Sequence, residues 1–270
     1  MTVRATTRLC GVVGDPVAHS LSPAMHNAAF AYLGLDFAYV ALPVATADLA
    51  AAIDGARALG FVGLNVTLPH KEAALSCCEP DELARAVGAV NTIVFDGGRA
   101  RGTNTDVHGV DQSLGDARIG RAVVVGAGGA ARAAIYALDR RGVDVEVLAR
   151  TARPLGARRT IALDDGRAST VLSRADLVID ATPIGLGEGP IAWPIDVLPP
   201  SVRVIDLVAR ASTPLLRAAQ AQRLAVKSGA DMLLHQGALA FELFTQRRAP
   251  VDVMRRALRD ALDAAEARPT

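Results

Sequence analysis

The stretch RAVVVGAGGAARAAIYALDRR, residues 121–141, decides the fold of this chain. Its run of valines is typical of a buried strand, the glycines that follow allow a tight turn, and the amphipathic run beyond them predicts a helix that ends near Arg141. Strand, glycine turn and helix in this order form one half of a β-α-β unit. We therefore expect an α/β fold with a parallel sheet around this segment.

The turn inside this stretch fits the G-x-G-x-x-G/A pattern of dinucleotide-binding folds. Gly126 permits the tight turn, Gly128 lets the backbone approach a pyrophosphate, and the small Ala131 allows the helix to pack closely. The N-terminus of the helix then lies next to the phosphates, whose charge it favours. The turn therefore predicts a dinucleotide site.

The end of the next predicted strand favours NADP over NAD. In an NAD-preferring site an acidic residue at this point binds the ribose 2′-hydroxyl, but here the sequence is Leu148-Ala149-Arg150-Thr151-Ala152-Arg153. Arginines can pair with the 2′-phosphate of NADP. Because arginine is abundant throughout the chain, the missing acid counts as much as the two arginines.

Strand-like and helix-like stretches alternate on both sides of this segment. A helix is predicted from Ser22-Pro23, with proline at its first position and Gly34 at its end, and Asp96–Arg99 predicts a hairpin turn. The pattern indicates two lobes, the first with a mostly parallel sheet and the second with a doubly wound parallel sheet. The predicted strands are residues 9–13, 38–44, 61–66 and 90–95 in the first lobe and 122–125, 143–148, 177–180 and 202–207 in the second, with further helices after Pro214 and over 231–245.

Composition excludes several classes of protein. The 270 residues are 51% hydrophobic and 21% charged, and 29 basic side chains balance 28 acidic ones, so nucleic-acid and membrane partners lack their usual electrostatic support. No apolar stretch approaches the roughly 18 to 20 residues of a membrane span. The 3 cysteines have neither metal-ligand nor disulfide spacing. We expect a soluble cytoplasmic protein without a metal, either a monomer or a homodimer.

Two rare residue types gather in the first part of the chain. Lys71 and Lys227 are the only lysines, and unlike arginine a lysine can release its proton, so Lys71 is a candidate proton shuttle; a leftover surface lysine is the alternative. Short polar side chains at the ends of apolar runs suit a site for a hydroxylated small molecule, although asparagine also bends loops. The asparagines are Asn27, Asn65, Asn91 and Asn104.

Five ordered motifs resemble those of shikimate dehydrogenases, and the likeness covers nearly the whole chain. The resemblance implies a substrate-binding and catalytic domain over residues 1–106, a Rossmann-type NADP domain over 107–235, and C-terminal helices over 236–270 that pack back toward the substrate domain, with the active site in the cleft between the domains. The motifs are GDPVAHSLSPAMHN at 14–27, NVTLPHK at 65–71, GAVNT at 88–92, GTNTD at 102–106 and the glycine turn at 126, followed by TPLL at 213–216 with Gly229, Met232 and Gln236.

The resemblance also implies a role for individual residues. Lys71 and Asp106 would be the catalytic pair. Ser22 is equally well explained as a helix N-cap, because serine before a proline commonly starts a helix. The substrate-binding residues would be Ser20, Ser22, Asn65, Thr67, Asn91 and Gln236, with Asp106 also in contact. The cofactor-binding residues would be Gly126, Ala127, Gly128, Gly129, Ala130, Arg150, Thr151, Arg153, Leu207, Gly229 and Met232.

The implied reaction is the reversible reduction of 3-dehydroshikimate to shikimate, a step of aromatic amino acid biosynthesis, by hydride from NADPH. Lys71, an ammonium at neutral pH and held so by Asp106, would supply the proton. The sequence departs from the family at Ala209, where many members have a tyrosine that reaches the substrate carboxylate. A quinate/shikimate dehydrogenase, a paralogue acting on a modified shikimate and a non-catalytic metabolite sensor are therefore alternatives.

Overall fold

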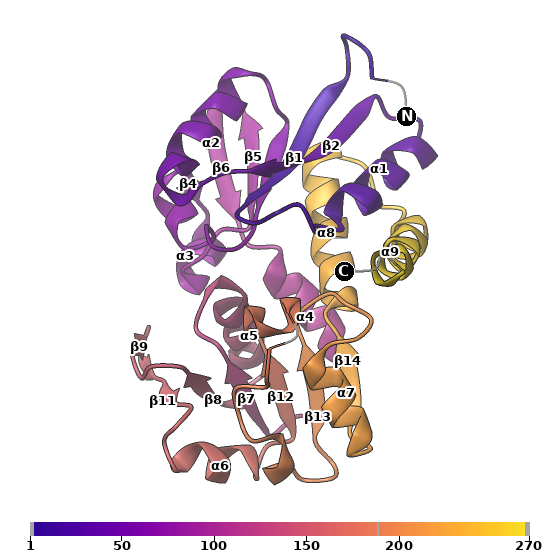
Figure 1. Ribbon diagram of the computed structural model, residues 1–270. Helices are drawn as coiled ribbons and strands as arrows, with labels where there is room; N and C mark the ends of the chain where they lie inside the picture. The colour runs from indigo at the N-terminus through magenta and orange to yellow at the C-terminus, as the bar shows by residue number, and fades with distance from the viewer. Residues whose placement is uncertain (1–2, 188, 268–270) are drawn as a thin grey trace. The chain divides into compact units, whose positions relative to one another are not determined.

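The computed structural model describes residues 3–187 and 189–267, and its contacts divide the chain into two compact units (Figure 1). The first unit joins residues 1–109 to residues 233–270, and the second unit is residues 110–232. These limits lie three residues from the boundaries after 106 and 235 that we expected from the sequence.

The first unit is built on a six-stranded sheet in which most strands run parallel. The central strand β1 pairs in parallel with β2 and β3, whereas β5 is antiparallel to both β3 and β6. Gly97 and Gly98, with φ of 55° and 78°, form the predicted hairpin turn between β5 and β6, because both positions need left-handed backbone. In sheet order the strands are β2 (Phe37–Pro43), β1 (Arg8–Gly14), β3 (Gly63–Val66), β5 (Thr92–Asp96), β6 (Arg99–Thr103) and β4 (Glu79–Pro80).

Helices cover both faces of this sheet. Leu49 and Ile53 of α2 pack with Leu64 and Ile93 of the sheet in one core cluster, which also contains Ala84 of α3. On the other side the ring of Phe30 in α1 stacks with Phe241 of α8 at 5.3 Å, and α9 packs against α1. The helices of the unit are α1 (Ser22–Tyr32), α2 (Leu49–Ala58), α3 (Glu82–Val87) and α9 (Val251–Glu266), with short 3₁₀ turns η1 (Thr46–Asp48) and η2 (Ala73–Ser76). Helices α4 (Asp106–Leu114) and α8 (Ala230–Thr245) each extend across a limit of the unit.

One glycine allows α8 to lie on the sheet. A Cβ atom at Gly63 would be 2.4 Å from the ring of Phe244 and 2.6 Å from the carbonyl oxygen of Ile93. Phe244, which is 2% exposed, fills the space that a side chain at Gly63 would take. Helix α8 therefore completes the core of the unit that the N-terminal residues begin.

The second unit is a doubly wound parallel sheet, as predicted. Its strand order, β11-β8-β7-β12-β13-β14, places the strand that precedes the glycine turn in the middle, with the chain winding outward on both sides. The strands are β11 (Ile161–Ala162), β8 (Asp144–Ala149), β7 (Arg121–Val125), β12 (Leu177–Asp180), β13 (Arg203–Asp206) and β14 (Ala225–Ser228), with a small hairpin of β9 (Pro154–Leu155) and β10 (Arg158–Arg159).

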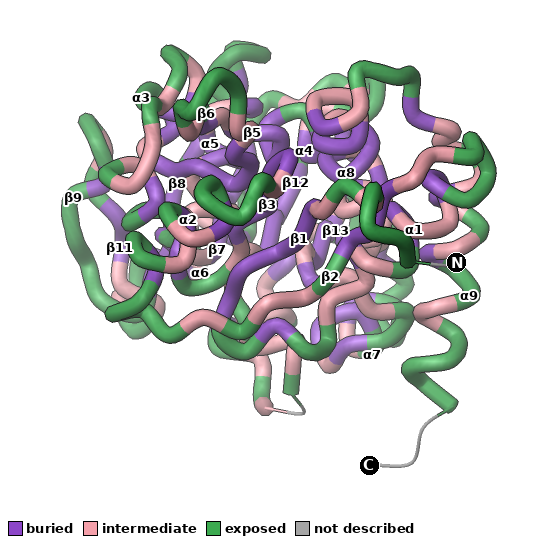
Figure 2. The backbone as a smooth tube through the Cα atoms, turned by 90° about the horizontal axis from the view of Figure 1, so that it is seen from above, coloured by how far each residue is buried: buried purple, intermediate pink, exposed green. Residues whose placement is uncertain are grey.

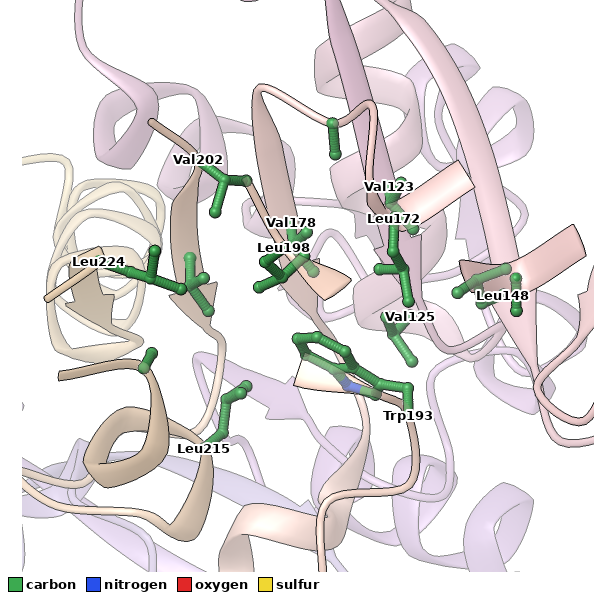
Figure 3. Close-up of a cluster of buried hydrophobic side chains, with 14 of the residues drawn as sticks. Val123, Val125, Leu148, Leu172, Val178, Trp193, Leu198, Val202, Leu215 and Leu224 are labelled. Atoms are coloured by element: carbon green, nitrogen blue, oxygen red, sulfur yellow. The ribbon is translucent and has the colours of Figure 1, made fainter. Parts of the chain in front are cut away.

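The core of the second unit lies between the sheet and two crossover helices. Val125, Val178 and Leu172 belong to the same core cluster as Trp193, which is 4% exposed (Figure 3). Trp193 donates its indole N–H to Asp180 at 2.8 Å, so its polar end is satisfied inside the core. The helices of this unit are α5 (Gly129–Arg140), α6 (Arg167–Leu172) and α7 (Pro214–Ala221), with 3₁₀ turns η3 (Pro183–Leu186) and η4 (Ile195–Val197).

Burial follows the sheets. Most residues of β1 and β13 are buried, whereas the residues in the last turns of α9 are exposed (Figure 2). None of the helices within residues 3–187 and 189–267 has both the length and the apolar character that crossing a membrane requires.

Candidate active site

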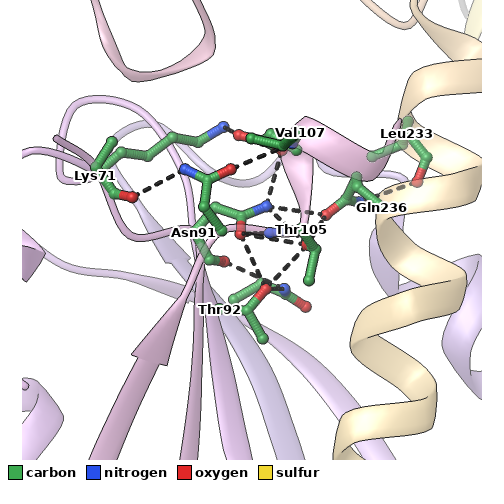
Figure 4. A network of polar contacts seen from close by, with 11 residues as sticks. Lys71, Asn91, Thr92, Thr105, Val107, Leu233 and Gln236 are labelled. Atoms are coloured by element: carbon green, nitrogen blue, oxygen red, sulfur yellow. Dashed lines mark hydrogen bonds and ion pairs between the residues drawn. The ribbon is translucent and has the colours of Figure 1, made fainter. Parts of the chain in front are cut away.

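A buried ion pair lies at the end of the first sheet. Lys71 follows β3, and Asp106 is the first residue of α4; the ammonium Nζ of Lys71 donates to Oδ2 of Asp106 at 2.6 Å (Figure 4). The lysine side chain is 16% exposed and the aspartate 3%. The backbone also holds the lysine, since Val90 donates its N–H to the Lys71 carbonyl at 2.8 Å. Lys71 is therefore not a leftover surface lysine, and its ammonium has limited access to solvent.

Asn91 binds the other oxygen of the aspartate. Its amide nitrogen donates to Oδ1 of Asp106 at 2.8 Å, and its amide oxygen accepts the backbone N–H of Thr105 at 2.6 Å. The same nitrogen lies 3.3 Å from the side-chain oxygen of Gln236, whose own nitrogen donates to the Leu233 carbonyl at 2.9 Å. Both oxygens of Asp106 thus have a donor, so the buried carboxyl group has hydrogen-bond partners on both sides.

Asn65 lies behind this pair and is 6% exposed. Its amide oxygen accepts the phenol of Tyr39 at 2.7 Å, and its amide nitrogen donates to the Thr92 hydroxyl at 2.9 Å and the Asn91 carbonyl at 3.2 Å. Burial raises the pKa of the Tyr39 phenol well above its usual value, so the phenol stays protonated and remains a donor. The protein itself therefore uses most of the hydrogen-bonding capacity of Asn65.

The two serines and Thr67 lie near the carboxyl ends of neighbouring parallel strands. Thr67 directly follows β3, and its methyl group occupies the space where Gly14, at the end of β1, lacks a side chain. Ser20 accepts the backbone N–H of Ser22 at 3.3 Å. Carboxyl ends of parallel strands meet at one sheet edge, so these hydroxyls lie on the side of the sheet where Lys71 follows β3.

Ser22 does not cap α1 as the N-cap alternative proposed. The helix already includes Ser22, and the residue that precedes it is Leu21, which offers no side-chain cap. Proline at the next position supplies helical backbone without needing a donor, so the helix starts without a hydroxyl cap.

The other asparagines outside this cluster have structural partners. Asn27 exchanges two hydrogen bonds of 2.9 Å with the backbone of Tyr39, which ties α1 to β2 rather than bending a loop. Asn104 donates to the Ala89 carbonyl at 2.9 Å and accepts the N–H of Val107 at 3.3 Å at the start of α4.

The glycine turn of the second unit suits a phosphate group. Gly126 has a φ of 118°, and a Cβ atom there would lie 3.2 Å from the backbone of Ala181. A Cβ atom at Gly128 would meet nothing within 4 Å, so the turn leaves open space beside its backbone. Gly128 precedes α5, and no side chain caps this helix. Gly129 and Ala130 are its first residues, and their N–H groups point out of the helix end, as phosphate binding requires.

The two arginines after β8 have different surroundings. The Arg153 guanidinium donates to the carbonyl of Ala127 at 2.7 Å, so it braces the glycine turn. Arg150 is exposed, as is Thr151. Since β8 neighbours β7, the exposed guanidinium of Arg150 lies at the same sheet edge as the turn.

The remaining predicted cofactor residues come together at the ends of β13 and β14. A Cβ atom at Gly229 would lie 2.1 Å from the carbonyl oxygen of Leu207, so only glycine lets these two backbones approach. Met232 is 6% exposed. Ala209, two residues after Leu207, is partly exposed.

Two acidic residues at the same edge were not among the expected site residues. Asp180 ends β12 and Asp206 ends β13, and burial raises the pKa of both carboxyls. Asp206 accepts the Thr213 hydroxyl at 2.6 Å, and together with Asp180 it borders a small pocket of the second unit. Their partners are all within the unit, which is the pattern of residues that hold loops in place.

No group of three or more histidine, cysteine, aspartate or glutamate side chains within the described residues is arranged to hold a metal ion. Cys10 is buried and Cys77 and Cys78 are partly buried, all as free thiols. His70 lies 2.7 Å from the Val44 carbonyl through Nε2.

Three members of the hydrogen-bond network were not predicted from the sequence. They are Thr92 and Thr105, which Figure 4 labels, and Tyr39, which donates to Asn65. Thr92 and Thr105 stand directly beside Asn91 and Asp106 in the chain, and this adjacency was the available signal. Tyr39 gave none, because a tyrosine within an apolar strand fits an ordinary core position equally well.

A glycine turn for a dinucleotide in one α/β unit, and a buried lysine–aspartate pair in the other, define a nicotinamide-dependent oxidoreductase. Comparison with known proteins specifies which. The model of the shikimate dehydrogenase substrate-binding domain matches residues 12–93, and that of the shikimate 5′-dehydrogenase C-terminal domain matches residues 229–259. The chain belongs to the shikimate dehydrogenase family.

Individual relatives match over almost the full chain. A shikimate dehydrogenase (NADP⁺) of Methanopyrus kandleri is 42% identical over 97% of this chain and 98% of its own. The structure of a Thermus thermophilus shikimate 5-dehydrogenase with NADP(H) and shikimate has a TM-score of 0.83 at 39% identity, covering 95% of this chain and all of that chain. A Corynebacterium glutamicum quinate dehydrogenase with NAD also has a TM-score of 0.83, at 33% identity over 94% and 99% of the two chains.

Proposed function

We propose that this protein reduces 3-dehydroshikimate to shikimate with NADPH, and catalyses the reverse oxidation, with Lys71 and Asp106 as the catalytic pair. The observation that carries the proposal is the 2.6 Å contact between the Lys71 ammonium and the Asp106 carboxylate at the end of a substrate-domain sheet. A proton donor of fixed position is what reduction of a ketone to an alcohol needs from the protein.

Lys71 has a proton role in both directions. During reduction its Nζ donates a proton to the oxygen of the reacting carbonyl, and during oxidation the neutral amine accepts the proton of the hydroxyl. Asp106 orients the ammonium through Oδ2, while Asn91 holds Oδ1 at 2.8 Å. Because the amine must be neutral to accept a proton, oxidation of the alcohol speeds up as the pH rises.

The second unit fits a nicotinamide dinucleotide. When bound, the cofactor supplies or accepts the hydride. Gly126, Gly128 and the N-terminus of α5 would hold its pyrophosphate, Arg150 and Thr151 its adenosine phosphate, and Leu207, Gly229 and Met232 the side of the nicotinamide. The open space beside Gly128 and the uncapped start of α5 support this assignment.

The substrate carboxylate is assigned to Ser20, Ser22 and Thr67, whose hydroxyls follow the ends of β1 and β3. Asn91, Asp106 and Gln236 would contact the ring hydroxyls. Many family members have a tyrosine at the position of Ala209, and this chain lacks that hydroxyl. The assignment of the carboxylate therefore relies on the hydroxyls of the first unit.

The test is an oxidation assay of the purified protein with shikimate and with quinate, each against NADP⁺ and NAD⁺. We expect turnover with shikimate and NADP⁺ to exceed the other three combinations. Turnover with quinate and NAD⁺ instead would favour the second candidate, a quinate dehydrogenase, to which the similarity with the Corynebacterium glutamicum structure points. Cofactor binding without turnover of either ring would contradict the proposal and leave a modified substrate or a binding-only role.

The exposed arginine after β8 makes a separate prediction about the cofactor. Arg150→Gln should raise KM for NADP⁺ by about tenfold and leave KM for NAD⁺ unchanged, because a charge-assisted hydrogen bond contributes about 1.5–3 kcal/mol. Arg140→Gln, at the opposite end of α5, is the matched control and should change neither value. Equal effects on both cofactors would assign the 2′-phosphate to another residue.

A further inference from the structure

We propose that Thr92 is a positioning residue for the Lys71–Asp106 pair and acts through Asn91. The inference rests on the proposed function, because that function gives the pair its catalytic role. Thr92 is the first residue of β5 and is fully buried. Its hydroxyl lies within hydrogen-bond distance of three side chains, those of Asn65, Asn91 and Thr105.

The asparagine partners of Thr92 indicate the direction of its hydrogen bonds. The amide nitrogen of Asn65 donates to the Thr92 oxygen at 2.9 Å, since the other end of that amide already accepts the Tyr39 phenol at 2.7 Å. Thr92 has only one proton to give. With the Thr105 hydroxyl as the donor of the 3.1 Å contact between the two threonines, Thr92 donates its proton to the amide oxygen of Asn91, also at 3.1 Å. Donation thus runs from Tyr39 through Asn65 and Thr92 to Asn91.

This direction determines which end of Asn91 faces the catalytic aspartate. The Asn91 oxygen receives donors from the Thr92 hydroxyl and from the Thr105 backbone, at 3.1 and 2.6 Å. Its nitrogen must then point the other way, where it donates to Asp106 at 2.8 Å. A reversed amide would set its oxygen against the carboxylate and lose all three bonds.

The consequence for catalysis concerns the orientation of the Asp106 carboxylate relative to the Lys71 ammonium. With Asn91 held on Oδ1, only Oδ2 is left for the lysine, and the ammonium is aimed by a carboxylate that cannot rotate freely. The network is buried, so water cannot replace a lost hydroxyl without opening the core. Removal of the Thr92 hydroxyl would therefore loosen Asn91 and then the ion pair, without touching either member of it.

The experiment compares Thr92→Val, which removes the hydroxyl at nearly constant volume, with Thr92→Ser, which keeps it. We expect Thr92→Val to lower kcat for shikimate oxidation about tenfold while KM changes less than about twofold, as a loss of alignment would do. Thr92→Ser should keep kcat within about twofold of the wild type. If the valine variant does not fold, Thr92→Ala removes the same hydroxyl without placing a methyl group against Asn65.

A second readout does not depend on activity. Lys71 and Lys227 are the only lysines, so a sample labelled with ¹³C-lysine gives two sets of side-chain NMR signals. Loss of the Thr92 hydroxyl should shift the Lys71 signal and leave that of Lys227, which donates to the Ser113 carbonyl in the second unit, in place. The control is Thr213→Val, which removes a buried hydroxyl from the second unit. It tests whether lower stability by itself shifts the Lys71 signal, and we expect that signal to stay unchanged.

The outcomes separate the two proposals. A wild-type kcat and an unchanged Lys71 signal in the valine or alanine variant would overturn the role of Thr92, as would a lower melting temperature as the sole effect. A wild-type protein that does not oxidise shikimate would overturn the proposed function, and the Lys71 signal would then decide the role of Thr92 by itself.

Discussion

Lys71→Arg is expected to lower kcat for shikimate oxidation by about 10³-fold or more, with KM for shikimate changed only a few-fold. Arginine keeps the positive charge and can still pair with Asp106, but it does not release its proton in a protein. The variant therefore separates a proton-transfer role from a merely electrostatic one. The measurement is the steady-state rate with NADP⁺ across a range of pH, in which the wild-type rate should rise with pH and the residual rate of the variant should not.

The chain supplies its own control for this substitution. Lys227, the only other lysine, is exposed on β14 of the second unit, and Lys227→Arg should leave kcat and its pH dependence as in the wild type. If Lys71→Arg kept full activity, the ion pair would be structural and the proton would have to come from elsewhere.

The second large effect is a loss of stability in mild acid that depends on His26. This side chain is fully buried, and neither of its ring nitrogens has a hydrogen-bond partner among the described residues. Its ring stacks on Tyr39 at 4.2 Å and lies among Phe30, Phe241 and Phe244. Burial without a partner lowers the pKa of His26 from 6.5 to about 3, so the histidine is neutral in the folded protein.

The sign of the effect follows from which state takes up the proton. Below pH 6.5 His26 binds a proton in the unfolded chain, whereas in the folded protein it stays neutral down to about pH 3. The free energy of unfolding therefore falls as the pH is lowered from 6.5 toward 3. One such group contributes about 1.4 kcal/mol per pH unit, or about 2 kcal/mol between pH 7.5 and pH 5. Urea unfolding at a series of pH values measures it.

His26→Phe keeps a flat ring on Tyr39 and removes the titrating group. The variant should show a flatter dependence of unfolding free energy on pH between 7.5 and 5, whatever the larger ring does to stability at neutral pH. His108→Gln, which removes an exposed histidine of α4, should keep the wild-type slope. Equal slopes for the wild type and His26→Phe would mean that other groups cause the acid sensitivity.

The sequence predicted the long strands of both units to within about two residues at each end. In the second unit the strands predicted at 122–125, 177–180 and 202–207 are mostly buried and apolar, whereas Asp144 and Glu146 are exposed in the strand predicted at 143–148. The glycine turn at 126 sets the winding of these strands, so local pattern and global fold agree. Strand β14 was missed, because its alternating exposure and its lysine at Lys227 make it resemble a surface loop. The hairpin of β9 and β10 was missed because two-residue strands carry no periodic signal.

The pairing of Lys71 with Asp106 could be expected from the sequence, but the side chains that support this pair could not. Lys71 was notable because lysine is rare in this chain, and Asp106 because it ends a family motif. Tyr39 and Thr92 both contact Asn65, across 26 and 27 residues of sequence, and no spacing in the sequence indicates such long-range contacts. The roles of the individual binding residues stay predictions until variants are measured.

The first unit is discontinuous in the chain, and this affects the order in which the protein is completed during synthesis. Residues 110–232 contain all that the second unit needs, whereas the space at Gly63 in the first unit is filled by Phe244, which the ribosome makes after residue 232. Domains usually fold in the order of their synthesis. Here the nascent chain can finish the domain encoded in the middle while the one begun first still exposes an apolar sheet face, so chaperone dependence should be concentrated in the N-terminal segment.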